Sequence, residues 1–161
     1  MKRVALAAGL LAAAAAPSYA ATATTSFNVT ASVIDVCTVT ASTLAFGTYN
    51  PIAATNLDGT STVGVLCTLN TPYNVRLAAG TNGSSVTARK MIRASGTELM
   101  SYSLFRDSSR SQNWGVTDNT DTSNGTGSGL LQNITVYGRI PASENVPAGS
   151  YSDSVLVTVN Y

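Results

Sequence analysis

The chain has 161 residues, of which 44% are hydrophobic and only 11% are charged, and its formal net charge is +1. This length predicts one domain with a substantial core, and the near-neutral charge excludes the basic surface that nucleic-acid binding needs. The chain has no histidine, the commonest general base and metal ligand, and it contains neither a nucleophile elbow nor a phosphate-binding loop. We therefore expect neither an enzyme nor a bound cofactor or metal ion.

The first predicted element is a secretion signal. Lys2 and Arg3 precede an apolar run over residues 4–16, and a small-residue cleavage site ends at Ala20. The apolar run is shorter than the roughly 20 residues that a membrane-spanning helix needs. We expect residues 1–20 to be removed as a signal peptide, so that the protein is exported, soluble and not membrane-spanning.

An alternating segment follows the signal. Within residues 21–36, one side of a strand would carry Phe27, Val29, Ala31 and Val33. The pattern leaves two interpretations open. The segment is either the domain's own first strand, or a strand that fills a gap in the sheet of another copy by β-augmentation.

The only two cysteines of the chain come next, at Cys37 and Cys67. Export leads to an oxidising compartment, which favours joining them. A redox or metal site would need a closer pair or further ligands, and neither is present. We therefore predict a structural disulfide, which contributes about 3–4 kcal/mol by closing a loop of roughly 30 residues.

The rest of the chain alternates between short strands and turns, with hardly any helical periodicity. Turn-forming pairs such as Asn50-Pro51 and Asn82-Gly83 divide it, and residues 117–129 are predicted to form a loop or a long hairpin tip. The predicted strands cover residues 37–46, 60–69, 73–78, 88–94, 98–106, 130–140 and 151–161. Seven or eight short strands are typical of an antiparallel β-sandwich.

The last predicted strand, residues 151–161, runs to the carboxyl terminus with no partner strand after it. If this strand lies beside a gap in the sheet, the domain lacks one strand of its own. Such a gap would be an exposed apolar edge and would favour self-association until another strand covers it.

The most specific sequence pattern is VYGRIP at residues 136–141, followed by VPAGSYSD at 146–153 and VLVTVNY at 155–161. Earlier blocks are CTVTASTLAFGTYNP at 37–51, VLCT at 65–68, TPYNV at 71–75, ARKM at 88–91, YSLFRD at 102–107 and NWG at 113–115. Together these blocks resemble the spore coat protein U domain family, in order and over essentially the whole chain after the signal. This family includes pilin subunits of archaic chaperone–usher pili, which are linked to biofilm formation.

The resemblance implies an all-β fold over residues 37–161, an incomplete immunoglobulin-like antiparallel sandwich that lacks its last strand. It implies three kinds of partner: a periplasmic chaperone that lends a strand to the monomer, an outer-membrane usher, and further pilin subunits in a cell-surface fibre. In that fibre the amino-terminal extension of one subunit, residues 21–36, completes the next. The pocket-filling side chains would be those of Phe27, Val29, Ala31 and Val33.

The resemblance also assigns a role to the end of the chain. The chaperone would face a terminal strand that carries Val155, Val157, Val159 and Tyr161. In related systems the chaperone holds the terminal carboxylate of the subunit, which here would be that of Tyr161.

Two other functions stay open, a secreted spore-coat or matrix protein and a carbohydrate-binding module. Aromatic side chains could stack on sugar rings, although most aromatics in sandwiches pack in the core or at an edge. The candidates are Tyr102, Trp114, Tyr137 and Tyr151. One basic cluster, formed by Arg89, Lys90 and Arg93, is predicted to lie on an exposed face.

Overall fold

The computed structural model describes residues 19–161, and these residues form nine β-strands and no helix. No helix of the length and hydropathy needed to cross a membrane occurs among them. The predicted signal peptide, residues 1–20, lies outside the described residues except for Tyr19 and Ala20. The strands are β1 (Cys37–Ala41), β2 (Leu57–Cys67), β3 (Pro72–Leu77), β4 (Arg89–Arg93), β5 (Leu99–Phe105), β6 (Ser123–Thr126), β7 (Gln132–Ile140), β8 (Tyr151–Ser152) and β9 (Val157–Asn160).

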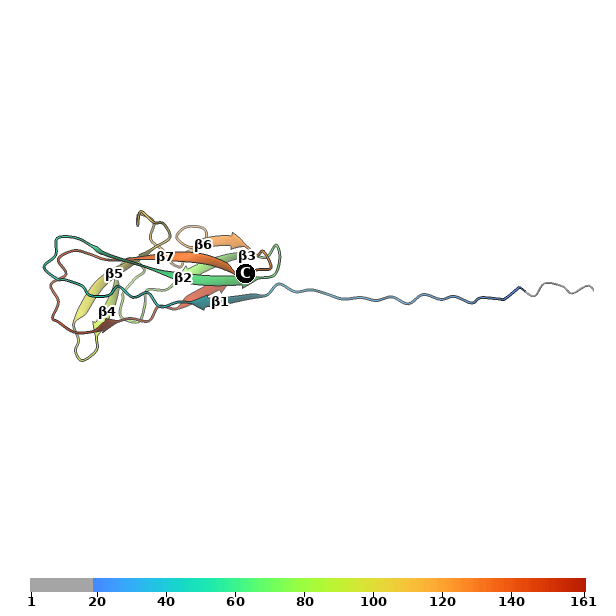
Figure 1. Cartoon of the computed structure of the whole chain (residues 1–161), viewed down its shortest axis with the longest axis horizontal. Helices are drawn as coiled ribbons and strands as arrows, with labels where there is room; N and C mark the ends of the chain where they lie inside the picture. The colour runs from blue at the N-terminus through green and yellow to red at the C-terminus, as the bar shows by residue number, and fades with distance from the viewer. Residues whose placement is uncertain (1–18) are drawn as a thin grey trace, which may run out of the picture. The chain divides into compact units, whose positions relative to one another are not determined.

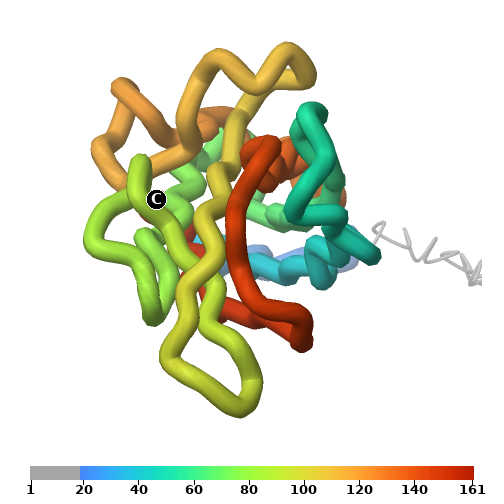
Figure 2. Tube along the Cα trace, turned by 90° about the vertical axis from the view of Figure 1, so that its left-hand side faces the viewer, coloured from blue at the N-terminus to red at the C-terminus, as the bar shows by residue number. Residues whose placement is uncertain are grey.

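The strands form two antiparallel sheets, which confirms the predicted all-β fold class. One sheet has the order β1-β2-β7-β5-β4-β8, and the other has the order β6-β3-β9 (Figure 1). The C-terminal segment runs beside the β4–β5 hairpin, where β8 pairs with β4 (Figure 2). The chain divides into two units, Met1–Ser32 and Val33–Tyr161, and all nine strands belong to the second.

Alternation along the strands produces the core between the sheets. In β3 and β5 every second side chain is buried, as the sequence pattern predicted. These side chains are Tyr73, Val75 and Leu77 from β3 and Met100, Tyr102 and Leu104 from β5. Trp114 is completely buried among them, and its indole nitrogen donates a hydrogen bond of 2.8 Å to the carbonyl oxygen of Val75.

The predicted disulfide is present, and it joins Cys37 at the start of β1 to Cys67 at the end of β2. The two residues also face each other in the β1–β2 ladder. Because β1 pairs with no other strand among the described residues, the disulfide holds an edge strand onto the sheet.

Three predicted elements differ from the structure. The predicted strand 37–46 is shorter, because β1 ends at Ala41 and residues 42–46 belong to no strand. The predicted loop 117–129 contains β6, which pairs with β3 and places Gly125 opposite Tyr73. The predicted single strand 151–161 is two strands in different sheets, because residues 153–156 cross from the edge of one sheet to the edge of the other. For β6 and for the C-terminal segment, the strand that pairs with the residues comes from a distant part of the chain. The periodicity of the segment itself does not identify that partner.

Candidate functional site: an open groove between two strand edges

The two sheets end in neighbouring strands that do not pair with each other. β1 pairs only with β2, and β9 pairs only with β3. These two edge strands lie close together, but no ladder of hydrogen bonds connects them in the described part of the chain. Each therefore presents a row of backbone groups that another strand can bind.

The inner face of β1 shows that a neighbour is lacking there. Val39 is directly opposite Val65 in the ladder, so both side chains point to the same face. Val65 is completely buried, whereas Val39 keeps 37% of its surface exposed. The interior is thus covered on the side of β2 and open on the side of β9.

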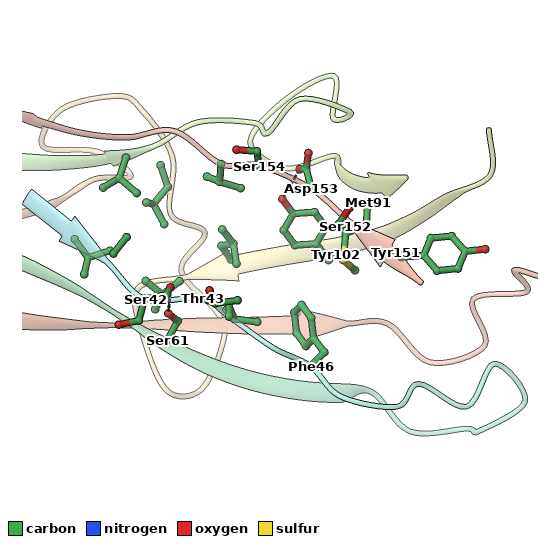
Figure 3. A pocket seen from close by; sticks show the side chains of 18 residues that line it. Ser42, Thr43, Phe46, Ser61, Met91, Tyr102, Tyr151, Ser152, Asp153 and Ser154 are labelled. Carbon is green, nitrogen blue, oxygen red and sulfur yellow. Dashed lines mark hydrogen bonds between the residues drawn. The ribbon is translucent and has the colours of Figure 1, made fainter. Parts of the chain in front are cut away.

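An apolar groove of about 570 Å³ opens between the two edges. One wall is formed by residues 41–46, which continue from the end of β1, and the other by residues 151–157, which include β8 and the start of β9. Core side chains from five strands form the floor, namely Val63, Leu77, Met91, Tyr102, Leu104 and Val136. Figure 3 shows Phe46 on one side of the groove and Ser152 and Asp153 on the other, with Tyr102 between them.

A second cavity of about 600 Å³ continues the groove toward the loops after β7. Residues 44–51 and 146–151 form its walls, and Met91, Met100 and Ile140 line its base. The two cavities share four side chains, those of Leu44, Phe46, Met91 and Tyr151. Because they share these side chains, the two cavities form one continuous groove.

The wall that follows β1 is held by side chains. Among the described residues, the last backbone hydrogen bond of this segment is from Ser42 to Thr62, and residues 43–49 make none. The hydroxyl of Tyr49 donates to the carbonyl oxygen of Pro141 at 2.7 Å and accepts from the backbone N–H of Glu144 at 2.8 Å. The backbone of this wall is therefore fixed in place while its hydrogen-bonding groups stay available.

The opposite wall is fixed by Asp153. Its carboxylate accepts hydrogen bonds from the backbone N–H of Thr81 at 2.9 Å and from the hydroxyl of Tyr102 at 2.6 Å. Burial disfavours the charged carboxylate, but these hydrogen bonds together outweigh burial and hold the pKa of Asp153 below its usual value. Burial, followed by the hydrogen bond to Asp153, raises the pKa of Tyr102.

The C-terminal residues that the sequence analysis selected lie at this wall. Val155 and Val157 line the groove, and Val159 packs against the core from β9. Tyr161 is exposed. The alternation of the terminal strand is thus real, although its first part belongs to the other sheet.

The residues selected as a donor strand are exposed and form no strand in this chain by themselves. They are Phe27, Val29, Ala31 and Val33. Their role stays a prediction. The sequence analysis did not single out Leu44, Phe46 or Tyr49 as wall residues, although the block at 37–51 contains all three.

The structure bears on the alternative of sugar binding and on the predicted basic cluster. Trp114 and Tyr102 are buried, so the four candidate aromatic side chains do not form one exposed surface for sugar rings. Arg89 is completely buried, and its guanidinium donates hydrogen bonds to four backbone carbonyl oxygens. The predicted exposed basic cluster is therefore wrong at Arg89, because the carbonyls of Leu77, Ala78 and Trp114 come from other segments and join that of nearby Val86 around the guanidinium. No group of three or more potential metal-ligating side chains occurs in residues 19–161.

The described residues thus form an all-β domain of antiparallel sheets, in which the edges of β1 and β9 are unpaired and a largely apolar groove opens beside them. The chain belongs to the Spore Coat Protein U domain family, whose model matches residues 23–158. This confirms the resemblance found in the sequence.

The chain is also similar to two individual proteins. Protein U of Myxococcus xanthus is 35% identical over 159 residues, which cover 90% of this chain and 88% of that protein. Among solved structures, the chain is similar to a chain in the crystal structure of the CsuC–CsuE chaperone–tip adhesion subunit pre-assembly complex from archaic chaperone–usher Csu pili of Acinetobacter baumannii. That match has a TM-score of 0.58 and 28% identity, and it covers 80% of this chain and 40% of the solved chain.

Proposed function

We propose that this protein is an exported, non-enzymatic structural subunit of a bacterial surface fibre of the archaic chaperone–usher type. The observation that carries the proposal is the largely apolar groove between residues 41–46 and residues 151–157, whose floor is the hydrophobic core itself. The similarity to a chain from a chaperone–subunit complex supports the same function. Fibres of this kind support adhesion and biofilm formation.

In this proposal, subunits polymerise by donor-strand complementation. Residues 1–20 are the signal peptide, residues 21–36 are the donor extension, and residues 37–161 are the acceptor domain. Phe27, Val29, Ala31 and Val33 of one copy would enter the groove of the next. Their spacing of two residues lets all four side chains point at the floor while the backbone pairs with both edges.

The interactions that the donor strand would make are strong enough to favour its insertion. Burying a valine or phenylalanine side chain contributes about 1.5–3 kcal/mol, and the alanine contributes less. Each ladder hydrogen bond adds about 0.5–1.5 kcal/mol net. A strand of seven residues therefore contributes on the order of 10 kcal/mol before the cost of ordering it.

In this proposal, the groove also gives a chaperone and an usher their roles. Before assembly, the open groove is an aggregation hazard, which a chaperone strand would remove by covering it. The chaperone would contact the wall that carries Val155, Val157 and Val159, and would hold the carboxylate of Tyr161. The usher would then exchange the chaperone strand for the extension of the next subunit.

Deleting residues 21–33 tests the proposal. The deleted chain should still bind its chaperone and accept a synthetic peptide of residues 21–33, but it should not extend a fibre. In the full-length chain, Val29→Asp should block polymerisation, whereas the matched control Thr30→Asp should not, because Thr30 lies on the opposite side of the strand. Normal fibres from the deleted chain would refute donor-strand exchange.

A secreted spore-coat or matrix protein is the second candidate, and the match to the Spore Coat Protein U domain family favours it. It would use the same groove for association between copies. Electron microscopy of cells with and without the gene distinguishes the two, since only the first requires surface fibres.

A further inference from the structure

Six exposed apolar side chains surround the point where the chain enters β1. We call this group the collar, and it consists of Ile34, Val36, Leu66, Leu69, Leu130 and Leu131. The most exposed are Leu130 and Ile34, each at 72%. All six belong to the unit Val33–Tyr161 and none of them lines the groove.

Hydrogen bonds bring these residues to one end of the domain. The backbone N–H of Thr68, between Leu66 and Leu69, donates to the carbonyl oxygen of Val36 at 3.0 Å. The N–H of Gly129, just before Leu130, donates to the carbonyl oxygen of Cys67 at 3.2 Å. The segment before β7 and the turn after β2 therefore lie side by side, next to the start of β1.

The chain just before β1 is clamped to the domain. The hydroxyl of Thr71 donates to the carboxylate of Asp35 at 2.6 Å, and Thr71 is buried. The backbone N–H of Val36 donates to the hydroxyl of Thr68 at 2.8 Å. Only Ile34 therefore separates the first clamped residue, Asp35, from Val33.

This clamp limits how far apart two joined copies can be. If Val33 fills the groove of another copy, as the proposed function requires, its Cα lies at most about 7 Å from that of Asp35. So short a connection between Val33 and Asp35 holds the acceptor domain against the end of the donor domain that carries the collar. Exposed leucines at that end would then be buried on assembly.

We propose that the collar is a docking surface for the next copy of this chain, and that the bond between Asp35 and Thr71 fixes the angle of the joint. This proposal rests on the donor-strand function above. The collar of one copy meets a different surface of its neighbour, at the end of the groove from which the donor strand emerges. Such a heterologous contact repeats without closing and therefore suits a fibre.

The test compares fibres of the wild-type chain with fibres of Leu130→Ser combined with Leu131→Ser. Both substitutions are at exposed positions outside the groove, so a peptide of residues 21–33 should bind the variant within about twofold of the wild type. Its fibres should release subunits in guanidinium at least about tenfold faster, since apolar contacts between copies are lost. Val116→Ser, at an exposed valine outside the collar, should change neither quantity.

The outcomes distinguish a failure of the docking surface from a failure of the donor-strand function. Equal release rates for wild-type and collar-variant fibres would overturn the docking surface and leave the donor-strand function intact. Failure of the peptide to bind the wild-type chain would overturn both. For the clamp, Asp35→Ala should keep peptide binding but broaden the distribution of angles between successive subunits in electron micrographs, and an unchanged distribution would overturn the role of Asp35.

Discussion

Gly59 of β2 and Gly138 of β7 lie directly opposite each other in the ladder, and together they form a depression on the inner face of the sheet. The side chains of Leu44 and Phe46 lie in this depression. A Cβ atom on Gly138 would come within 2.8 Å of both side chains, and one on Gly59 within 3.2–3.3 Å. The segment after β1, which forms one wall of the groove, therefore packs against this pair of glycines.

Replacing Gly138 with alanine should narrow the groove. The new methyl group would push Leu44 and Phe46 toward the space that an incoming strand needs. We expect a peptide of residues 21–33 to bind Gly138→Ala about tenfold more weakly, as measured by fluorescence anisotropy. Adding Leu44→Ala should recover much of the lost affinity by freeing space. A loss of affinity that Leu44→Ala fails to relieve would contradict this explanation.

Removing the disulfide should destabilise the domain. Cys37→Ser combined with Cys67→Ser should lower the free energy of unfolding by about 3–4 kcal/mol, because the unfolded chain is no longer constrained by a closed loop. Urea unfolding followed by tryptophan fluorescence measures this change. Dithiothreitol should destabilise the wild-type chain similarly and leave the double variant unaffected.

Arg89 should be far more sensitive than its neighbour Lys90. Arg89→Ala would leave four backbone carbonyl oxygens without their donor in a buried site, so we expect a loss of at least about 3 kcal/mol of stability. Lys90 is half-buried and donates to the hydroxyl of Ser101, and Lys90→Ala should cost about 1 kcal/mol or less. Equal losses in urea unfolding would contradict the structural role of Arg89.

The stabilisation that Asp153 provides should depend on pH. Its pKa in the folded domain lies below the ordinary value of 3.8, so its contribution is complete above that value and is lost as the pH falls through the folded pKa. Asp153→Asn should therefore be less stable than the wild type at pH 6, and the difference should shrink toward pH 2. Tyr102→Phe, which removes one donor to Asp153, should show the same trend. A difference between wild type and Asp153→Asn that stays constant over this range would contradict the assignment.

The sequence predicted much of the fold because strand periodicity is a local property. Val75 and Tyr102 are buried because they alternate with polar neighbours, and this alternation is visible in the sequence. The disulfide followed from the presence of only two cysteines and a predicted export signal. The alternation over residues 27–33 is visible for the same reason, and their role as a donor strand stays a prediction.

Other features depended on segments that are distant in the sequence. Residues 123–126 consist of Ser, Asn, Gly and Thr, which favour turns, and they form a strand only because the edge of β3 lies beside them. Arg89 looks like part of a surface cluster, but carbonyl oxygens near residues 77, 86 and 114 converge on its guanidinium.

By itself, the sequence determined that the chain is an all-β domain with a disulfide and an alternating extension before it. Only the tertiary structure decided that the unpaired edges of β1 and β9 lie close together, and that a groove between residues 41–46 and residues 151–157 reaches the core. The physical reason is that periodicity records which face of a strand is apolar. Whether its edge is paired depends on which other strand the fold brings alongside.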